Sequence, residues 1–356
     1  MASLRLRDRD AIITPEGLIF RVFGYTHPPD AYVCDLEYAP ASLFKSNNPK
    51  APRLGGFYKF YDDEAWSFIQ TKFPQYLIPY EPLGRQILGV RKGDIGEVRR
   101  PQEALKRLLE NPARDPLIGT LRRVLNATVF ASGLSIEDFG VFGSMLHGFH
   151  HPLFSDIDLI VYGVENLAHI RRRLQELYAD KSSGFSNEFE DDAPIRGKRW
   201  RYKNLSPEEF VWHQRRKLVY GVFRDKASGR AIKVEFEPVK KWSETRNDYG
   251  EIKKITREGW IKALLRVRDD SEAPFMPSVY FVEPIEILEG PKAENIERVV
   301  SYIEEFRMQA WEGEMVYVEG NLEKVETSYG SFRQITLTYG QGYYEQTLKI
   351  ANRGHS

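Results

Sequence analysis

The sequence has a single cysteine, no excess of either charge and no long apolar run, and each of these features excludes a class of protein. Its one cysteine, Cys34, excludes an internal disulfide framework, and we expect a buried thiol in a reducing compartment. Lys plus Arg number 51 and Asp plus Glu number 51, so nucleic acid could be held only by local basic patches. No apolar run approaches the roughly 20 residues of a membrane-spanning helix, and residues 1–10 contain no apolar signal core. We therefore expect a soluble, cytoplasmic protein without a membrane partner.

The 356 residues are enough for two or three domains with sizeable cores. Changes in pattern along the chain predict an N-terminal α+β domain, a central domain and a β-rich C-terminal domain, with the bounds 1–95, 96–247 and 248–356. In the first of these, apolar runs predict a hairpin and a third strand, followed by a helix and then a Pro- and Gly-rich irregular segment. Those elements are expected at residues 17–25 and 31–38, 57–61, 62–73 and 74–100.

The central domain carries the most informative stretch of the chain. A Gly-Ser turn, Gly143 and Ser144, precedes an Asp-x-Asp pair, Asp156 and Asp158, which runs directly into the apolar residues 159–162. On a strand, the two carboxylates lie about 6.5 Å apart at their Cα atoms and point to the same face. Two carboxylates held together in this way suit Mg²⁺, which accepts a few carboxylate oxygens and leaves room for substrate phosphates.

This arrangement resembles the nucleotidyltransferase superfamily typified by polymerase beta. The spacing is most similar to that of the class I (archaeal-type) CCA-adding enzymes and the minimal nucleotidyltransferases. That family has a third carboxylate on a later strand, three positions before a proline, and Glu235 stands at this place before Pro238. Gly-Ser or Asp-x-Asp alone is more often an ordinary turn or a solvated strand entrance. The resemblance rests on all three elements and covers residues 139–238.

The resemblance implies a role for each matching residue. Asp156, Asp158 and Glu235 would bind two Mg²⁺ ions, and Glu235 would lie nearest to the acceptor hydroxyl and accept its proton. Gly143 and Ser144 would hold the β- and γ-phosphates of a nucleoside triphosphate (NTP). Family members more often carry Asp at the third position, and alternation places Glu237 on the same strand face as Glu235, so Glu237 is the reserve candidate.

A basic segment lies between the Asp-x-Asp strand and the strand of Glu235. Residues 196–203 and 213–217 interleave cations with aromatic side chains, a composition that suits a phosphate backbone and stacked bases. Lys198, Arg199 and Lys217 are therefore candidates for nucleotide binding. The alternative is a solvated loop whose charge is balanced by the acidic residues 188–192.

The elements of the last third of the chain favour a β barrel. Strands are expected at residues 251–256, 260–268 and 279–288, then a helix at 294–309, then strands at 315–325 and 332–338. Three strands, a helix and two strands are the element order of an OB barrel, a fold that binds single-stranded nucleic acid. Tyr317, Phe332 and Tyr339 could stack on bases, or they could alternate into the barrel core.

Helical patterns flank the motif in the central domain. Helices are expected at residues 101–110, 115–131, 166–178 and 206–216, and a hairpin at 218–223 and 231–237. His147, His150 and His151 have a spacing seen in metal clusters, but they fall in the segment that the family uses for its phosphate-binding turn. A histidine contact to a phosphate or a base is therefore the better hypothesis than zinc.

Together these patterns predict an α+β multidomain protein. Its centre is a polymerase beta-like nucleotidyltransferase fold, a mixed sheet with helices, flanked by the N-terminal α+β domain and an OB-like C-terminal domain. The predicted activity is Mg²⁺-dependent transfer of a nucleoside monophosphate from an NTP to an acceptor hydroxyl, with RNA, including tRNA, as the favoured acceptor. The motif lies far from residue 1 and no tail-binding domain is recognisable, so CCA addition is not predicted.

Two alternatives to this activity stay open. One is transfer to a small molecule or a protein, as in toxin-like or antibiotic-modifying enzymes. The other is a nucleic-acid-binding protein that retains the fold without turnover. The sequence indicates neither the preferred NTP nor the oligomeric state.

Overall fold

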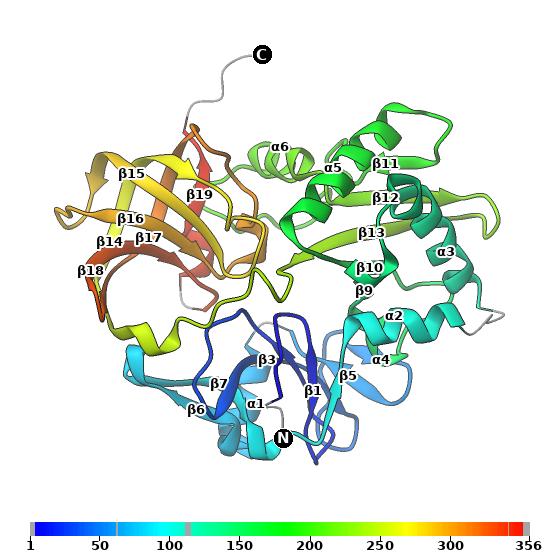
Figure 1. Ribbon diagram of the computed structural model, residues 1–356, viewed down its shortest axis with the longest axis horizontal. Coiled ribbons are helices and arrows are strands. Elements are labelled where there is room, and N and C mark those ends of the chain that lie inside the picture. The colour runs from blue at the N-terminus through cyan, green and yellow to red at the C-terminus, as the bar shows by residue number, and fades with distance from the viewer. Residues whose placement is uncertain (1–3, 62, 111–114, 341, 352–356) are drawn as a thin grey trace. The chain divides into compact units, whose positions relative to one another are not determined.

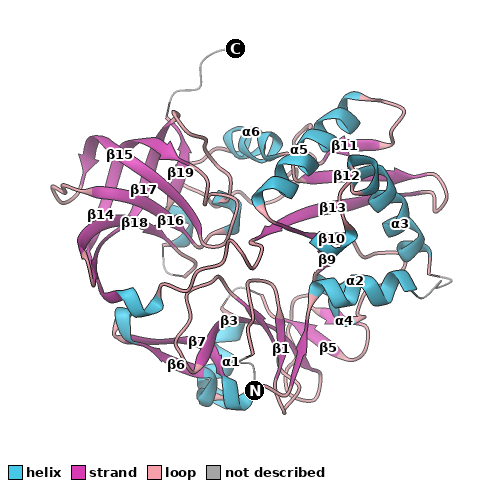
Figure 2. Cartoon of the chain, in the orientation of Figure 1, coloured by secondary structure: helices cyan, strands magenta, loops and turns pink. Residues whose placement is uncertain are grey.

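The structure, a computed structural model, describes residues 4–61, 63–110, 115–340 and 342–351 (Figure 1). The chain forms two compact units. Unit 1 comprises Met1–Tyr80, Gln86–Asn187 and Leu218–Asn247, and unit 2 comprises Glu81–Arg85, Glu188–Lys217 and Asp248–Ser356. Most described helices belong to unit 1, whereas unit 2 is built mainly from strands (Figure 2). The fold is therefore of mixed α+β class, as expected.

The first sheet of unit 1 contains the N-terminal strands in the order β4-β5-β3-β2-β1-β8, with β7 paired to β3 and β6 to β7. The expected hairpin is confirmed, because β2 and β3 pair antiparallel. Its elements are β1 (Ala11–Ile13), β2 (Ile19–Val22), β3 (Ala31–Pro40), β4 (Pro52–Arg53), β5 (Phe57–Lys59), α1 (Glu64–Lys72), β6 (Leu77–Tyr80), β7 (Arg85–Arg91) and β8 (Glu97–Arg99).

The prediction that residues 74–100 are irregular was wrong, because this segment contains β6, β7 and β8. The glycines that suggested a loop serve close packing instead. A Cβ on Gly89 of β7 would lie 2.3 Å from the side chain of Ile78, so only glycine lets β6 and β7 approach in this way. Val90 beside it is fully buried in the core of the first sheet.

The second sheet of unit 1 has the strand order β11-β12-β13-β10-β9, and β10 and β13 run parallel. The helices and the hairpin predicted around the motif in this unit are confirmed. The elements are α2 (Pro101–Glu110), α3 (Pro116–Thr128), β9 (Phe139–Val141), α4 (Gly143–His147), β10 (Ile157–Tyr162), α5 (Val164–Ala179), β11 (Phe185–Asn187), β12 (Tyr220–Asp225) and β13 (Arg230–Val239).

Polar contacts cap helix α3 and hold it against this sheet. Asp115 caps α3 by accepting a hydrogen bond from the backbone N–H of Leu117 at 2.8 Å. Asp225, at the end of β12, accepts hydrogen bonds from Arg123 and Thr120 of α3 at 2.7–2.8 Å. Burial raises the pKa of the Asp225 carboxyl, but these hydrogen bonds outweigh it and hold the pKa well below its usual range. The ion pair thus anchors α3 to the strand next to β13.

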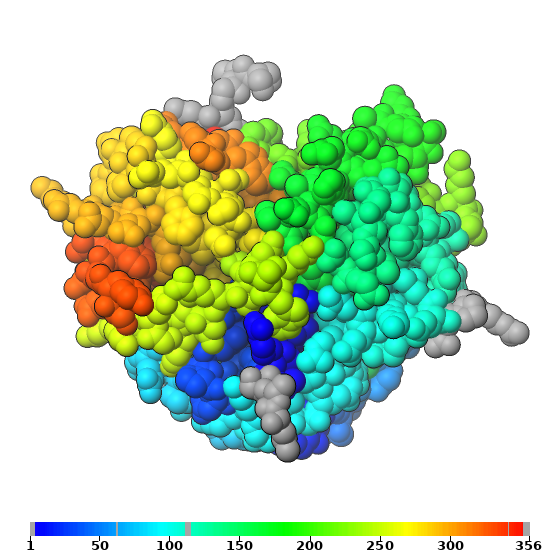
Figure 3. Space-filling model, viewed as in Figure 1, coloured from blue at the N-terminus to red at the C-terminus, as the bar shows by residue number. Residues whose placement is uncertain are grey.

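The N-terminal residues connect the two sheets of unit 1. The guanidinium of Arg7 lies 3.6 Å from the ring centroid of Tyr162 and 4.7 Å from that of Trp242, and it donates to the backbone oxygen of Lys240 at 3.1 Å. In Figure 3 the dark-blue N-terminal segment packs against the yellow-green segment after β13. This packing brings the N-terminal residues to the sheet that carries the carboxylates.

Unit 2 contains a closed ring of strands. The strands follow the order β14-β15-β16-β18-β17, and β17 pairs again with β14, while β19 adds to β17. Within the ring β16 and β18 are parallel. The bounds are β14 (Ile252–Asp269), β15 (Ser278–Glu289), β16 (Ile296–Ser301), β17 (Met315–Thr327), β18 (Gly330–Leu337) and β19 (Thr347–Ile350).

The helix predicted at residues 294–309 was wrong, because this segment forms β16 and a short 3₁₀ turn. The β-branched pair Val299 and Val300 is buried between β15 and β18, so tertiary pairing overrides the helical spacing. The two strands predicted at 251–256 and 260–268 are one strand, β14, with a register shift at Arg257 and Gly259.

The segment before β12 also belongs to unit 2. Trp200, Tyr202 and Phe210 pack against the barrel core around the buried Leu205. The next helix, α6 (Pro207–Lys217), agrees with the helix expected at residues 206–216 and begins with a capping box. Ser206 N donates to Glu209 Oε2 at 2.8 Å, and Glu209 N donates to Ser206 Oγ at 3.2 Å. None of the described helices is long and apolar enough to cross a membrane.

Candidate functional site

The parallel strands β10 and β13 place two of the predicted carboxylates side by side. Asp158 and Glu235 are direct partners in the register of these strands. Paired residues in a sheet share a face, so both carboxylates project on the same side. Their neighbours Leu159 and Phe236 are fully buried on the opposite side. The apolar residues around the motif thus bury one side of the strands and leave an acidic face on the other.

Gly143 brings the Gly-Ser turn into contact with this acidic face. Its φ is +58°, and a Cβ built on it would lie 2.4 Å from Asp158 Oδ2. This approach is fixed by the backbone, because the N–H of Phe142 donates to the backbone oxygen of Asp158 at 2.9 Å. Only glycine accommodates both the left-handed backbone and the carboxylate. The turn and the Asp-x-Asp pair are therefore one geometric unit.

Negative charge is concentrated around Asp158. Burial raises its pKa to about 7, and the charges of Glu237 and Asp156 add to that rise, whereas Lys59 opposes it. Asp156 itself is exposed, and Glu235 is half-buried. Like charges that cannot separate disfavour ionisation of the buried member. A bound cation would relieve this repulsion.

Glu237 has a different environment from Glu235. Arg9 Nη2 donates to Glu237 Oε2 at 2.8 Å, and both side chains are buried. Arg9 adopts a left-handed backbone with φ +71°, which is unusual for a side chain other than glycine. The pair gives Glu237 a structural partner, yet the charge of Glu237 also acts on Asp158. The choice between Glu235 and Glu237 as the third site carboxylate therefore stays a prediction.

The donor set suits Mg²⁺, which takes carboxylate oxygens. Among the described residues, however, no group of three or more His, Cys, Asp or Glu side chains is gathered closely enough to hold a metal ion. The register joins Asp158 with Glu235, and the charge of Asp156 reaches Asp158. Convergence of all three carboxylates stays a prediction.

The predicted nucleotide-binding cations belong to unit 2. Lys217 is fully buried, and its ammonium donates to the backbone oxygen of Glu305 at 2.6 Å. Lys198 and Arg199 are exposed. Binding of nucleotide by these three residues stays a prediction, but the hydrogen bond of Lys217 already gives that side chain a structural task.

Arg199 lines a hollow on unit 2 together with Trp200, Arg201 and Tyr344. The Arg201 guanidinium lies 4.0 Å from the ring centroid of Tyr344. Guanidinium groups beside aromatic rings can contact both the phosphates and the bases of a nucleic-acid strand. The hollow therefore combines cations with aromatic rings, the composition that was noted in the basic segment of the sequence.

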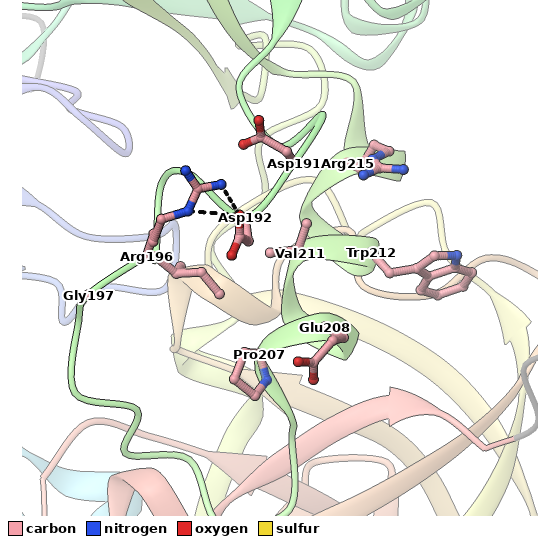
Figure 4. A pocket seen from close by; sticks show the side chains of 10 residues that line it. Asp191, Asp192, Arg196, Gly197, Pro207, Glu208, Val211, Trp212 and Arg215 are labelled. Atoms are coloured by element: carbon pink, nitrogen blue, oxygen red, sulfur yellow. Dashed lines mark hydrogen bonds and ion pairs between the residues drawn. The ribbon is translucent and has the colours of Figure 1, made fainter.

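A second hollow on unit 2 shows where part of that segment balances its own charge (Figure 4). Arg196 forms an ion pair with Asp192, drawn as dashed lines in Figure 4. Arg215 donates to the backbone oxygen of Phe189 at 2.8 Å and to that of Glu190. The acidic residues 188–192 therefore neutralise or engage some of the cations, as the alternative interpretation held.

The three histidines near the turn face different partners. His147 is buried, with its ring centroid 5.4 Å from that of Tyr38 and from that of Phe149. His150 Nε2 lies 3.0 Å from Asp115 Oδ2, and His151 Nδ1 accepts from a backbone N–H. Burial lowers the pKa of His147 to about 3, so this imidazole is neutral. These contacts indicate packing and turn-stabilising roles.

Sequence reasoning missed Arg9 and Lys59. Arg9 is 228 positions from Glu237 along the chain, so no local spacing could have linked them. Lys59 lies on β5 of the first sheet, and its charge acts on Asp158 of the second. In the sequence both are ordinary cations, and only the packing of the two sheets brings them near the acidic residues of β10 and β13.

The raised pKa of Asp158 predicts a pH-dependent stability of the metal-free protein. A carboxyl whose pKa is higher in the folded state favours folding below its ordinary pKa, and this contribution is lost as the pH rises through about 7. Asp158→Asn should therefore stabilise the metal-free protein by an amount that grows by about 1.4 kcal/mol per pH unit between pH 4 and 7 and stays constant above pH 7, so the rise in melting temperature should be several degrees at pH 8 and much smaller at pH 4.5.

The measurement is thermal unfolding in a chelating buffer across this pH range. Asp10→Asn is the control, because burial also raises the pKa of Asp10 to about 7 at a position on the N-terminal segment. Its stabilisation should follow the same pH course but respond weakly to added Mg²⁺. Equal effects of Asp158→Asn at pH 4.5 and 8 would contradict the assignment of a raised pKa.

Comparison with known proteins supports the resemblance seen in the sequence. Residues 121–219 match the family model described as a nucleotidyltransferase domain, which confirms the likeness to the polymerase beta-like superfamily. The matched residues include Gly143, Ser144, Asp156 and Asp158, and they end before Glu235. An uncharacterized protein of Methanocaldococcus jannaschii, MJ1086, is 28% identical over 354 residues, covering 98% of this chain and 99% of that protein. No solved structure gives a significant match.

Proposed function

We propose that the protein is a Mg²⁺-dependent nucleotidyltransferase that moves a nucleoside monophosphate from an NTP to an acceptor hydroxyl and releases pyrophosphate. The observation that carries this proposal is the pairing of Asp158 with Glu235 on parallel strands, with Gly143 in contact with Asp158. The nucleotidyltransferase match over residues 121–219 supports it.

Each of these residues has a proposed task in this reaction, and Glu235 has two. Asp156, Asp158 and Glu235 would hold the metal, which when bound neutralises phosphate charge and orients the reacting oxygens. Glu235 would accept the proton of the acceptor hydroxyl. Gly143 and Ser144 would hold the β- and γ-phosphates beside Asp158. Catalysis then consists mainly of positioning the reactants for in-line displacement at the α-phosphate.

RNA is the proposed acceptor. Two features of unit 2 support it: the hollow of Arg199, Trp200, Arg201 and Tyr344, and the closed five-stranded ring, which suits an OB-like barrel. Lys198 and Arg199 would contact the phosphates of the strand. We retain the division into domains 1–95, 96–247 and 248–356 as part of the proposal.

The acceptor is tested by incubating the full-length protein with Mg²⁺, each α-labelled NTP and total cellular extract, and then separating RNA, protein and small molecules. We expect label in the RNA fraction, and the NTP that labels it identifies the preferred base. Label in protein or metabolites would instead support the small-molecule or protein transferase. Tight RNA binding without label in any fraction would support the non-catalytic alternative.

A further inference from the structure

Strand β5 carries a lysine on the side of the first sheet that meets the Gly-Ser turn. Tyr38 of β3 and Lys59 of β5 are direct partners across the antiparallel strands, so their side chains share a face. Phe57, two residues earlier on β5, shares this face by alternation. The three side chains therefore mark one surface of the N-terminal sheet.

That surface packs on the residues that follow α4. The Phe57 ring is stacked on Phe149 with centroids 4.6 Å apart, and the Tyr38 ring meets Phe149 edge-on at 5.6 Å. Phe149 is tied to the turn, because its N–H donates to the backbone oxygen of Ser144 at 2.8 Å. Two aromatic contacts and one hydrogen bond thus connect the sheet that carries Lys59 with Ser144.

The ammonium of Lys59 is available for a ligand. The side chain is half-buried, and within the described part of the chain no carboxylate forms an ion pair with it. The Lys59 ammonium lies 5.9 Å from the ring centroid of Tyr61. Its charge also lowers the pKa of Asp158, so its field reaches the acidic face.

A cation near the site would reduce the repulsion between its carboxylates and a bound triphosphate. An NTP would add a strongly anionic triphosphate to a face on which Asp158 and Glu235 already lie side by side. Arg9, a cation that reaches the same strand, is already engaged by Glu237 at 2.8 Å. An ammonium without an anionic partner is suited to a phosphate chain as a point charge.

We propose that Lys59 binds the β- and γ-phosphates of the nucleoside triphosphate, so that the N-terminal sheet completes a site whose other residues lie in the nucleotidyltransferase domain. This inference rests on the proposed function, since it requires that the site binds an NTP beside Ser144. Lys59 lies outside the matched residues 121–219 and outside residues 139–238, over which the sequence motif extends.

The test is calorimetric binding of an α,β-methylene NTP analogue and of the corresponding monophosphate to the full-length protein with Mg²⁺. Lys59→Met should weaken binding of the analogue about tenfold or more, because a charge-assisted contact is lost, and leave the monophosphate within about twofold. Lys59→Arg should keep most of the affinity. Lys45→Met, an exposed lysine of the same sheet region, is the matched control and should change neither value.

The outcomes separate this inference from the proposed function. If the wild-type protein binds neither nucleotide, the proposed function fails and the inference with it. If the wild type binds the analogue and Lys59→Met binds it equally well, the inference alone is overturned. Equal losses for analogue and monophosphate would show a structural role and would also overturn it. Melting curves check folding, and Lys59→Gln replaces Lys59→Met if that variant does not fold.

Discussion

Asp158→Ala is expected to reduce nucleotide transfer by about a thousandfold or more, because a metal-binding carboxylate contributes several kcal/mol of charge stabilisation in the transition state. Folding should be retained, since the carboxylate removed is one that burial and its acidic neighbours already destabilise. Initial rates of label transfer at saturating NTP measure the effect, and melting curves check the fold.

Asp30→Ala is the matched control for this variant. Asp30 is an exposed aspartate of the same unit, and among the described residues its side chain forms no hydrogen bond or ion pair. Its replacement should leave the rate unchanged. A rate for Asp158→Ala above about a tenth of the wild-type value would contradict a role in binding the catalytic metal, because that loss is worth only about 1.4 kcal/mol.

Gly143→Ala is expected to lower the transfer rate by about a hundredfold, since a displacement of about 1 Å at a reacting centre can have an effect of that size. The new Cβ would lie 2.4 Å from Asp158 Oδ2, so either the carboxylate or the turn has to move. The left-handed backbone adds a strain of about 1–2 kcal/mol, which should appear as a lower melting temperature.

Gly148→Ala separates the collision from the backbone strain. Gly148 has φ +71°, close to that of Gly143, but a Cβ there meets no atom within 4 Å. It should therefore lower the melting temperature to a similar degree while the transfer rate stays within about threefold of wild type. Comparable activity of the two variants would show that the contact with Asp158 is unimportant for catalysis.

The carboxylate strands could be predicted from the sequence because their pattern is local. Asp158 leads directly into the apolar run 159–162, and the apolar residues around Glu235 alternate with period two, so both segments are typical of buried strands. The proline after Glu235 identified the third carboxylate through the family resemblance. The parallel pairing of the two strands comes from the structure alone, because α5, β11, α6 and β12 lie between them in the chain.

The failures of prediction have long-range causes. Residues 296–301 have helical spacing, yet they form β16 because both neighbouring strands of the barrel offer backbone partners. Gly89 suggested a loop, yet it permits the close approach of β6 and β7. Local pattern cannot reveal a partner that arrives from elsewhere in the chain.

The same limit applies to the site. Arg9 becomes meaningful only when the N-terminal segment packs against β13 and meets Glu237. Lys59 becomes meaningful only when the first sheet packs on Phe149. The sequence therefore predicts the chemistry of the carboxylates, whereas the cations that balance them emerge from tertiary packing.

The most direct measurement is the fate of two labels during transfer. The protein is incubated with Mg²⁺, RNA and an NTP that carries its label at either the α- or the γ-phosphate. The account predicts that the α-label enters RNA, that the γ-label leaves as pyrophosphate in equal amount, and that Asp158→Ala abolishes both. Entry of the γ-label into the acceptor, or transfer that does not depend on Asp158, would contradict it.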